Sequence, residues 1–112
     1  MSDCLFCRIV AGEIPATLVG ESEHTVAFRD IAPQAPTHVL VVPKDHYPDV
    51  AALSAHPALL AELVRQAHGV AADEGLVGRG YRLVFNTGAD AGQTVFHAHV
   101  HVLGGRALGQ LA

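Results

Sequence analysis

Residues 97–103 contain the pattern that most constrains the fold of this chain. Three histidines, His97, His99 and His101, alternate there with alanine or valine. Alternation with a period of two is typical of a β-strand, in which every second side chain leaves the same face. We therefore expect a strand over residues 95–103 with three imidazole rings in a row, about 7 Å apart.

Three roles are open for such a row of imidazole rings. The strand could be a buried one that happens to carry histidines, or the rings could form a His₃ zinc site with an open coordination position. The third role is nucleophilic or acid–base catalysis on a phosphate. A neutral imidazole attacks phosphorus well, and a protonated neighbour can hold a phosphate oxygen. An ordinary histidine pKa near 6.5 lets both forms coexist.

The segment just upstream of the row favours the catalytic role. Residues 86–94 include the amides Asn86 and Gln93, the hydroxyl of Thr94, and Gly92, which permits close backbone approach. Such groups suit a bound phosphate, although an ordinary connection between strands would also contain glycine and polar residues.

Length and composition limit the class of protein. A chain of 112 residues suits one domain with one core, which we place at residues 1–112. The net charge of −4 and the lack of a basic run give no sign of a nucleic-acid or membrane partner. The N-terminal residues lack the pattern of a signal peptide, so we expect a cytoplasmic protein.

Turn residues and periodicity predict an α+β fold with two helices and five strands. The helices are expected over residues 3–11, capped by Asp3, and over residues 57–74, which carry an apolar stripe. The strands are expected over residues 18–21, 25–29, 38–42, 81–86 and 95–103.

Four segments together resemble the histidine triad (HIT) superfamily of nucleotide hydrolases and transferases. They are residues 6–15, 28–38, 41–44 and 92–103. The HINT-like branch, the purine nucleoside phosphoramidases, is the best match. The transferase branch has Gln where His101 stands, and the diadenosine polyphosphate hydrolase branch typically has Gln where Asn86 stands.

This resemblance implies a fold, an activity and an assembly. The fold would be a HIT-like domain whose five-stranded antiparallel sheet joins that of a second copy in a homodimer, through residues 57–74 and 81–86. The activity would be hydrolysis of the P–N bond of purine nucleoside 5′-phosphoramidates. A diadenosine polyphosphate or other nucleotidyl hydrolase, and a non-enzymatic nucleotide-binding adaptor, are the alternatives.

The resemblance also implies roles for single residues. His99 would attack the α-phosphorus and form a nucleotidyl-histidine intermediate, His101 would hold a phosphate oxygen, and His38 would support the cluster. Asp30 would bind the ribose hydroxyls. The remaining nucleotide-binding residues would hold the phosphate or enclose the base: Asn86, Gly92, Gln93, Thr94, Leu5, Phe6, Ile9, Phe28 and Ile31.

The two cysteines, Cys4 and Cys7, stand three residues apart. A redox pair or a disulfide is possible, but a redox pair of the thioredoxin type needs a βαβ context that is missing here. Some bacterial members of the superfamily bind zinc at matching positions, which are Cys4, Cys7, His46 and His97. The resemblance therefore implies a structural zinc ion that the reaction does not require.

The C-terminal residues 106–112 depart from the HINT branch, which is typically longer here. This departure leaves the preferred leaving group open. The physiological substrate and the choice between adenine and guanine are also open, because an apolar base site accepts both purines.

Overall fold

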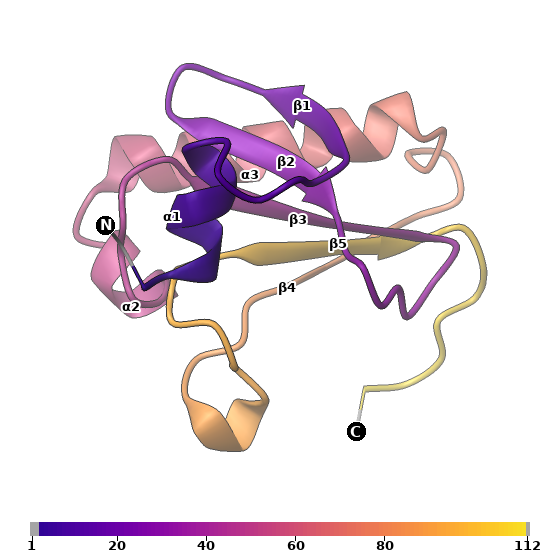
Figure 1. Ribbon diagram of the computed structural model, residues 1–112. Helices are drawn as coiled ribbons and strands as arrows, with labels where there is room; N and C mark the ends of the chain where they lie inside the picture. Colours follow the sequence, from indigo (N-terminus) through magenta and orange to yellow (C-terminus); the bar gives the residue numbers. More distant parts are fainter. Residues whose placement is uncertain (1–2, 112) are drawn as a thin grey trace.

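The computed structural model describes residues 3–111 and shows one five-stranded sheet with helices on both faces (Figure 1). All neighbouring strands are antiparallel, and their order is β1-β2-β3-β5-β4. The strands are β1 (Leu18–Glu21), β2 (Thr25–Arg29), β3 (Thr37–Pro43), β4 (Arg82–Val84) and β5 (Val100–Gly104). The helices are α1 (Leu5–Val10), α2 (Val50–Leu53), α3 (Pro57–Asp73) and the short 3-10 helix η1 (Ala89–Ala91). The expected α+β fold with a five-stranded antiparallel sheet is confirmed.

Strand β3 is the centre of the sheet. Every residue of it is buried, as its apolar run of residues 39–42, rich in valine, predicts for a strand covered on both faces. Its register pairs Leu40 with His101 and Val41 with Val100 on one side, and Leu40 with Phe28 on the other. This register places the last histidine of the row beside the middle of the sheet.

The two faces of the sheet have different cores. Helix α3 covers one face with the apolar stripe Leu63, Ala67, Val70 and Ala71. The short helix α1 covers part of the other face and packs Phe6 against Phe28 and Leu40 (Figure 1). Because α1 covers only part of its face, room is left there for a cavity.

Three helices differ from the expectation, namely α1, α2 and the 3-10 helix η1, which lies in a segment expected to be a loop. The first helix begins at Leu5, and its N-cap is Cys4 rather than Asp3, because the Cys4 Sγ accepts the backbone N–H of Cys7 at 3.4 Å. Helix α2 was not expected, because it has only four residues. Asp49 caps it through the backbone N–H of Ala52 at 2.9 Å.

Strand β5 is shorter than expected, because its first ladder pair is Val100 with Val41. Continuing this register would place His99 opposite Val42 and Ala98 opposite Pro43, which has no N–H to donate. The preceding residues bond to loops instead, and the Ala98 N–H donates to the carbonyl of Tyr47 at 2.6 Å. His97 and His99 therefore lie in an extended segment before the strand.

Within residues 3–111, none of the helices has the length and apolar character that crossing a lipid bilayer requires.

Candidate active site and metal centre

A cavity of about 400 Å³ opens beside α1, on the sheet face away from α3. All the expected nucleotide-binding residues except Gln93 line this cavity, together with His99 and His101. The other described residues on its wall were not expected from the sequence: Ile14, Pro15, Ala16, Arg29, Leu40 and Val95. The fold thus brings segments from both ends of the chain to one cavity.

The apolar end of the cavity is built by aromatic and aliphatic side chains. The rings of Phe6 and Phe28 meet edge to face with centroids 5.4 Å apart, and both side chains are buried. Leu5 is 42% exposed and Ile31 is 98% exposed at the same cavity. Exposed aliphatic groups facing a cavity are available to cover a flat apolar ligand.

Asp30 follows β2 and presents its carboxylate to the cavity. Its Oδ1 accepts the backbone N–H of Ala32 at 2.8 Å, which fixes the side chain. Its Oδ2 lies 3.4 Å from the Nε2 of His38. A carboxylate held in this way has acceptor capacity left for hydroxyl groups.

His99 is oriented by the backbone of its own segment. Its ring and that of Phe6 meet edge to face, with centroids 5.0 Å apart. Its Nδ1–H donates to the carbonyl oxygen of His97 at 2.7 Å, because a carbonyl can only accept. The neutral ring therefore has its lone pair on Nε2, the nitrogen left for the cavity that His99 lines.

His101 and His38 form a pair across strands β5 and β3. The Nδ1 of His101 lies 2.9 Å from the Nε2 of His38, and the His101 ring lies 5.0 Å from that of His99. The three imidazoles thus form one cluster, with His99 and His101 on the cavity wall and His38 behind them.

Burial lowers the pKa values of the clustered histidines, so the protonated form that the sequence suggested is disfavoured. Burial lowers the pKa of His99 and of His38 below the usual 6.5, although Asp30 opposes the shift at both. Burial, together with His99 and His38 nearby, lowers the pKa of His101 to about 4. Near neutral pH the cluster is therefore uncharged before ligand binds, and its N–H groups are neutral donors.

Acid should destabilise the protein between about pH 6.5 and pH 4. Below pH 6.5 an unfolded chain protonates His101 while the folded protein does not, so the free energy of unfolding falls with pH. Linkage gives about 2 kcal/mol at pH 5 from this residue. Urea denaturation at pH 7.5 and pH 5 measures the difference, which should be smaller in His101→Gln. An equal pH dependence in both proteins would contradict the shifted pKa.

The loop before the histidine segment is held by Gln93. This side chain is 4% exposed; its Oε1 accepts the Gly88 N–H at 2.8 Å, and its Nε2 donates to the carbonyls of Pro48 and Val95. Among the described residues it is a neighbour of the cavity wall rather than part of it. Gly92, with φ of +92°, and Thr94 on either side of it do line the cavity.

Arg29 contributes to the cavity wall, but its side chain extends toward the end of α3, on the other face of the sheet. Its guanidinium forms two hydrogen bonds with the carboxylate of Glu74, at 2.8 and 3.2 Å, and this pairing raises its pKa. Nothing in the sequence marks this arginine, because its partner lies 45 residues away at the end of α3.

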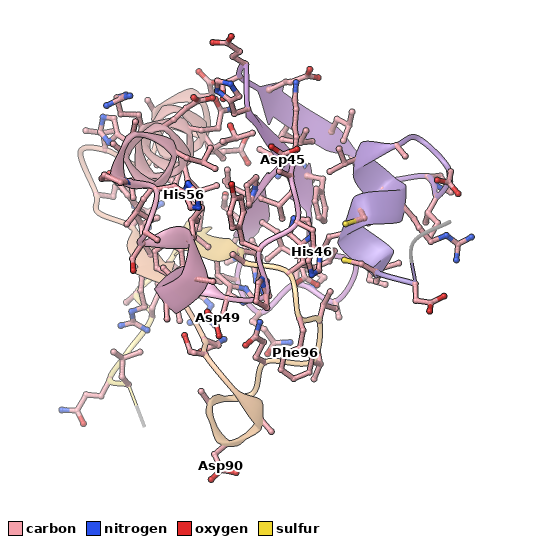
Figure 2. All side chains as sticks on the ribbon, turned by 90° about the vertical axis from the view of Figure 1, so that its left-hand side faces the viewer. Asp45, His46, Asp49, His56, Asp90 and Phe96 are labelled. Atoms are coloured by element: carbon pink, nitrogen blue, oxygen red, sulfur yellow. The ribbon has the colours of Figure 1, made fainter. Side chains whose placement is uncertain are left out.

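The four expected metal ligands come together near this cavity. Their ligand atoms lie within 4.8 Å of one another in Cys4, Cys7, His46 and His97. The Nδ1 of His97 is 3.3 Å from the Cys4 Sγ and 3.4 Å from the Cys7 Sγ, and the Nδ1 of His46 is 3.4 Å from the Cys7 Sγ. Figure 2 shows His46 next to the two sulfur atoms at α1.

A hydrogen bond at Nε2 fixes the tautomer of His97 that a metal ligand requires. Its Nε2–H donates to the carbonyl of Pro43 at 2.8 Å, so the lone pair of the neutral ring is on Nδ1, which faces the two sulfurs. Burial lowers the pKa of this ring, which keeps it neutral. A buried imidazole oriented by a carbonyl in this way is the usual arrangement of a metal-bound histidine.

Known proteins share both the sequence and the fold. The model of the HIT domain family matches residues 11–108. A HIT-like protein of Synechococcus elongatus is 50% identical over 107 residues, covering 95% of this chain and 93% of the relative. The purine nucleoside phosphoramidase of Escherichia coli is 43% identical over 110 residues, covering 97% of this chain and 92% of the relative.

Solved structures agree with these relatives. A HIT family hydrolase from Clostridium thermocellum has a TM-score of 0.93 at 42% identity, covering 99% of this chain and 97% of the other. A histidine triad protein from Clostridium difficile has a TM-score of 0.94 at 37% identity, covering 100% of this chain and 98% of the other. The chain therefore belongs to the HIT domain family.

Proposed function

We propose that the protein is a nucleotide hydrolase that cleaves the P–N bond of purine nucleoside 5′-phosphoramidates. The observation that carries this proposal is the orientation of His99. Its Nδ1–H donates to the His97 carbonyl, so the lone pair of the neutral ring is on Nε2. This nitrogen is available to a ligand in the cavity, which is large enough for a nucleotide. The name of the E. coli relative supports the choice of the P–N bond.

The reaction would take place in two displacements. In the first, the Nε2 of His99 bonds to the α-phosphorus while the P–N bond breaks, and the leaving amine takes up a proton. In the second, water bonds to phosphorus and loses a proton while the bond to Nε2 breaks, which releases the nucleoside monophosphate. A covalent intermediate divides one difficult displacement into two easier ones.

The cavity walls support a defined position for the nucleotide. The purine would lie against Leu5, Phe6, Ile9, Phe28 and Ile31, and the ribose hydroxyls would donate to Asp30. The phosphate would lie near His99, His101, Asn86, Gly92 and Thr94. Gln93 would act indirectly, by fixing the loop through its bonds to Gly88, Pro48 and Val95.

We also propose that the Cys4–Cys7–His46–His97 cluster holds a structural zinc ion. Two thiolates and two imidazoles form a closed tetrahedral set, in which neighbouring S and N ligands lie roughly 3.5 Å apart. The observed S···N distances of 3.3 to 3.4 Å are close to this value. When bound, the ion would tie α1 to the segment before β5, and it would supply no step of the reaction.

A homodimer fits the open edge of the sheet. Strand β4 is at one end of the strand order, so its outer backbone groups have no partner strand within residues 3–111. Pairing with a second copy would satisfy these groups and would extend the sheet. We propose that residues 57–74 and 81–86 form this contact, and that the protein acts in the cytoplasm.

A comparison of substrates tests the function. We expect adenosine 5′-phosphoramidate to have a kcat/KM at least tenfold above that of a diadenosine polyphosphate. A preference for the polyphosphate would replace the proposed substrate class and keep the nucleophile. AMP binding without turnover of either substrate would favour a nucleotide-binding adaptor and would refute the proposal.

A further inference from the structure

The turn after β5 holds the loop between β2 and β3. Gly105 has a φ of +98°, and a Cβ there would lie 2.8 Å from the Cβ of Pro36, so the two segments touch. Next to it, the Nη2 of Arg106 donates to the carbonyl of Gln34 at 3.0 Å, and the Nη1 donates to the carbonyl of Ala107 at 2.8 Å. The C-terminal turn therefore fixes residue 34 of the loop.

Gln34 in turn determines which nitrogen of His38 carries a proton. The backbone N–H of Gln34 donates to the Nδ1 of His38 at 3.0 Å. A backbone N–H can only donate, so this Nδ1 has the lone pair and the neutral ring is protonated on Nε2. His38 lies four residues further on, in β3, and its ring cannot satisfy this donor in any other tautomer.

The tautomer of His38 determines the tautomer of His101. The protonated Nε2 of His38 lies 2.9 Å from the Nδ1 of His101. Two N–H groups would repel each other at this distance, so the His101 Nδ1 is an acceptor and its Nε2 carries the proton. Asp30, at 3.4 Å from the same His38 nitrogen, is also an acceptor and is compatible with this arrangement.

We propose that Arg106 and Gln34 are positioning residues that fix the tautomers of His38 and His101. The two histidines on the cavity wall then have opposite roles: His99 is left with a lone pair on Nε2, and His101 is left with an N–H. The catalytic consequence rests on the proposed function, since a phosphate oxygen needs the donor and phosphorus needs the lone pair. The tautomers themselves do not depend on it.

The reverse tautomer would be unsuitable for phosphate. If His38 were protonated on Nδ1, its Nε2 would accept from the Nδ1–H of His101, and the Nε2 of His101 would present a lone pair to the phosphate. Lone pairs on both cavity histidines would repel the substrate oxygens. The backbone donor at residue 34 thus prevents a state that the His38–His101 distance alone permits.

Substitution at residue 34 isolates the backbone N–H. Gln34→Pro removes this donor, whereas Gln34→Ala keeps it and removes only the side chain. We expect ¹⁵N NMR of the ring nitrogens at pH 7.5 to show Nε2–H for His38 and His101 in the native protein and in Gln34→Ala. In Gln34→Pro both rings should shift toward Nδ1–H, His99 should stay Nδ1–H, and kcat should fall roughly tenfold.

Arg106 is tested by a second pair of variants, which leave the loop backbone intact. Arg106→Met should speed amide hydrogen exchange at Gln34 and lower kcat between about threefold and tenfold with KM unchanged. Arg106→Lys should restore part of both. Unchanged exchange in Arg106→Met would remove Arg106 from the proposal.

The native spectrum alone can overturn the inference, even if Gln34→Pro does not fold. A native His101 protonated on Nδ1 would refute it, and so would a folded Gln34→Pro variant with native tautomers. The expected tautomers together with no P–N hydrolysis would refute the proposed function and leave this inference standing.

Discussion

His99→Ala should lower kcat/KM by roughly 10⁴-fold or more, a loss typical of removing a catalytic nucleophile. Alanine has no nitrogen to bond to phosphorus, so the first displacement cannot occur. AMP should still bind, because Asp30, Asn86 and the apolar wall of the cavity are unchanged. Steady-state kinetics with adenosine 5′-phosphoramidate and calorimetric titration with AMP measure the two quantities.

The control for this variant is His56→Ala. His56 is an exposed histidine at the start of α3, and its side chain contacts Tyr47 rather than the cavity. We expect its kcat/KM to stay near the native value. Brief reaction with radiolabelled substrate should leave label on His99 in this control and none in His99→Ala. Substantial turnover by His99→Ala would refute the covalent route.

The row of histidines in an extended segment could be predicted because their spacing is itself structural information. A period of two, followed by glycines at positions 104 and 105, restricts residues 97–103 to an extended chain whatever its partners are. The exact start of the strand could not be predicted. It depends on Pro43, which stands 54 residues before His97 and lacks the N–H that would continue the ladder.

The role of Gln93 illustrates a different limit. In a loop that resembles a phosphate-binding loop, an amide side chain next to a glycine can contact either a ligand or the loop backbone. The sequence is the same in both cases. In the structure, the oxygen and the nitrogen of the Gln93 amide both form hydrogen bonds with backbone groups. Arg29 illustrates the same limit, because its guanidinium pairs with Glu74, the residue that follows α3, and the sequence does not reveal this partner.

Protonation was the property that sequence reasoning described least well. An exposed histidine has a pKa near 6.5, and a sequence does not reveal how much of each ring is covered. The fold packs His99 against Phe6 and against His101, and burial lowers the pKa of both histidines. Donor and acceptor roles here therefore come from tautomers rather than from charge.

Loss of the metal should cost the protein a large part of its thermal stability. At a zinc concentration 100-fold above the dissociation constant, binding to the folded state alone adds about 2.7 kcal/mol. For a domain of this size, that corresponds to a rise in Tm of roughly 10 °C or more. The Cys4→Ser, Cys7→Ser double variant should lose this increment and should purify without zinc.

Serine is the suitable replacement because Cys4 also caps α1 through the backbone N–H of Cys7, and a serine hydroxyl can accept the same bond. The variant thus removes the metal ligands and keeps the helix cap. In excess EDTA the native protein and the variant should melt within about 2 °C of each other, and added zinc should raise only the native Tm. One equivalent of zinc in the purified variant, measured by elemental analysis, would show that the two sulfurs are not ligands. A large Tm difference that persists in EDTA would show that the cysteines stabilise the fold by packing instead.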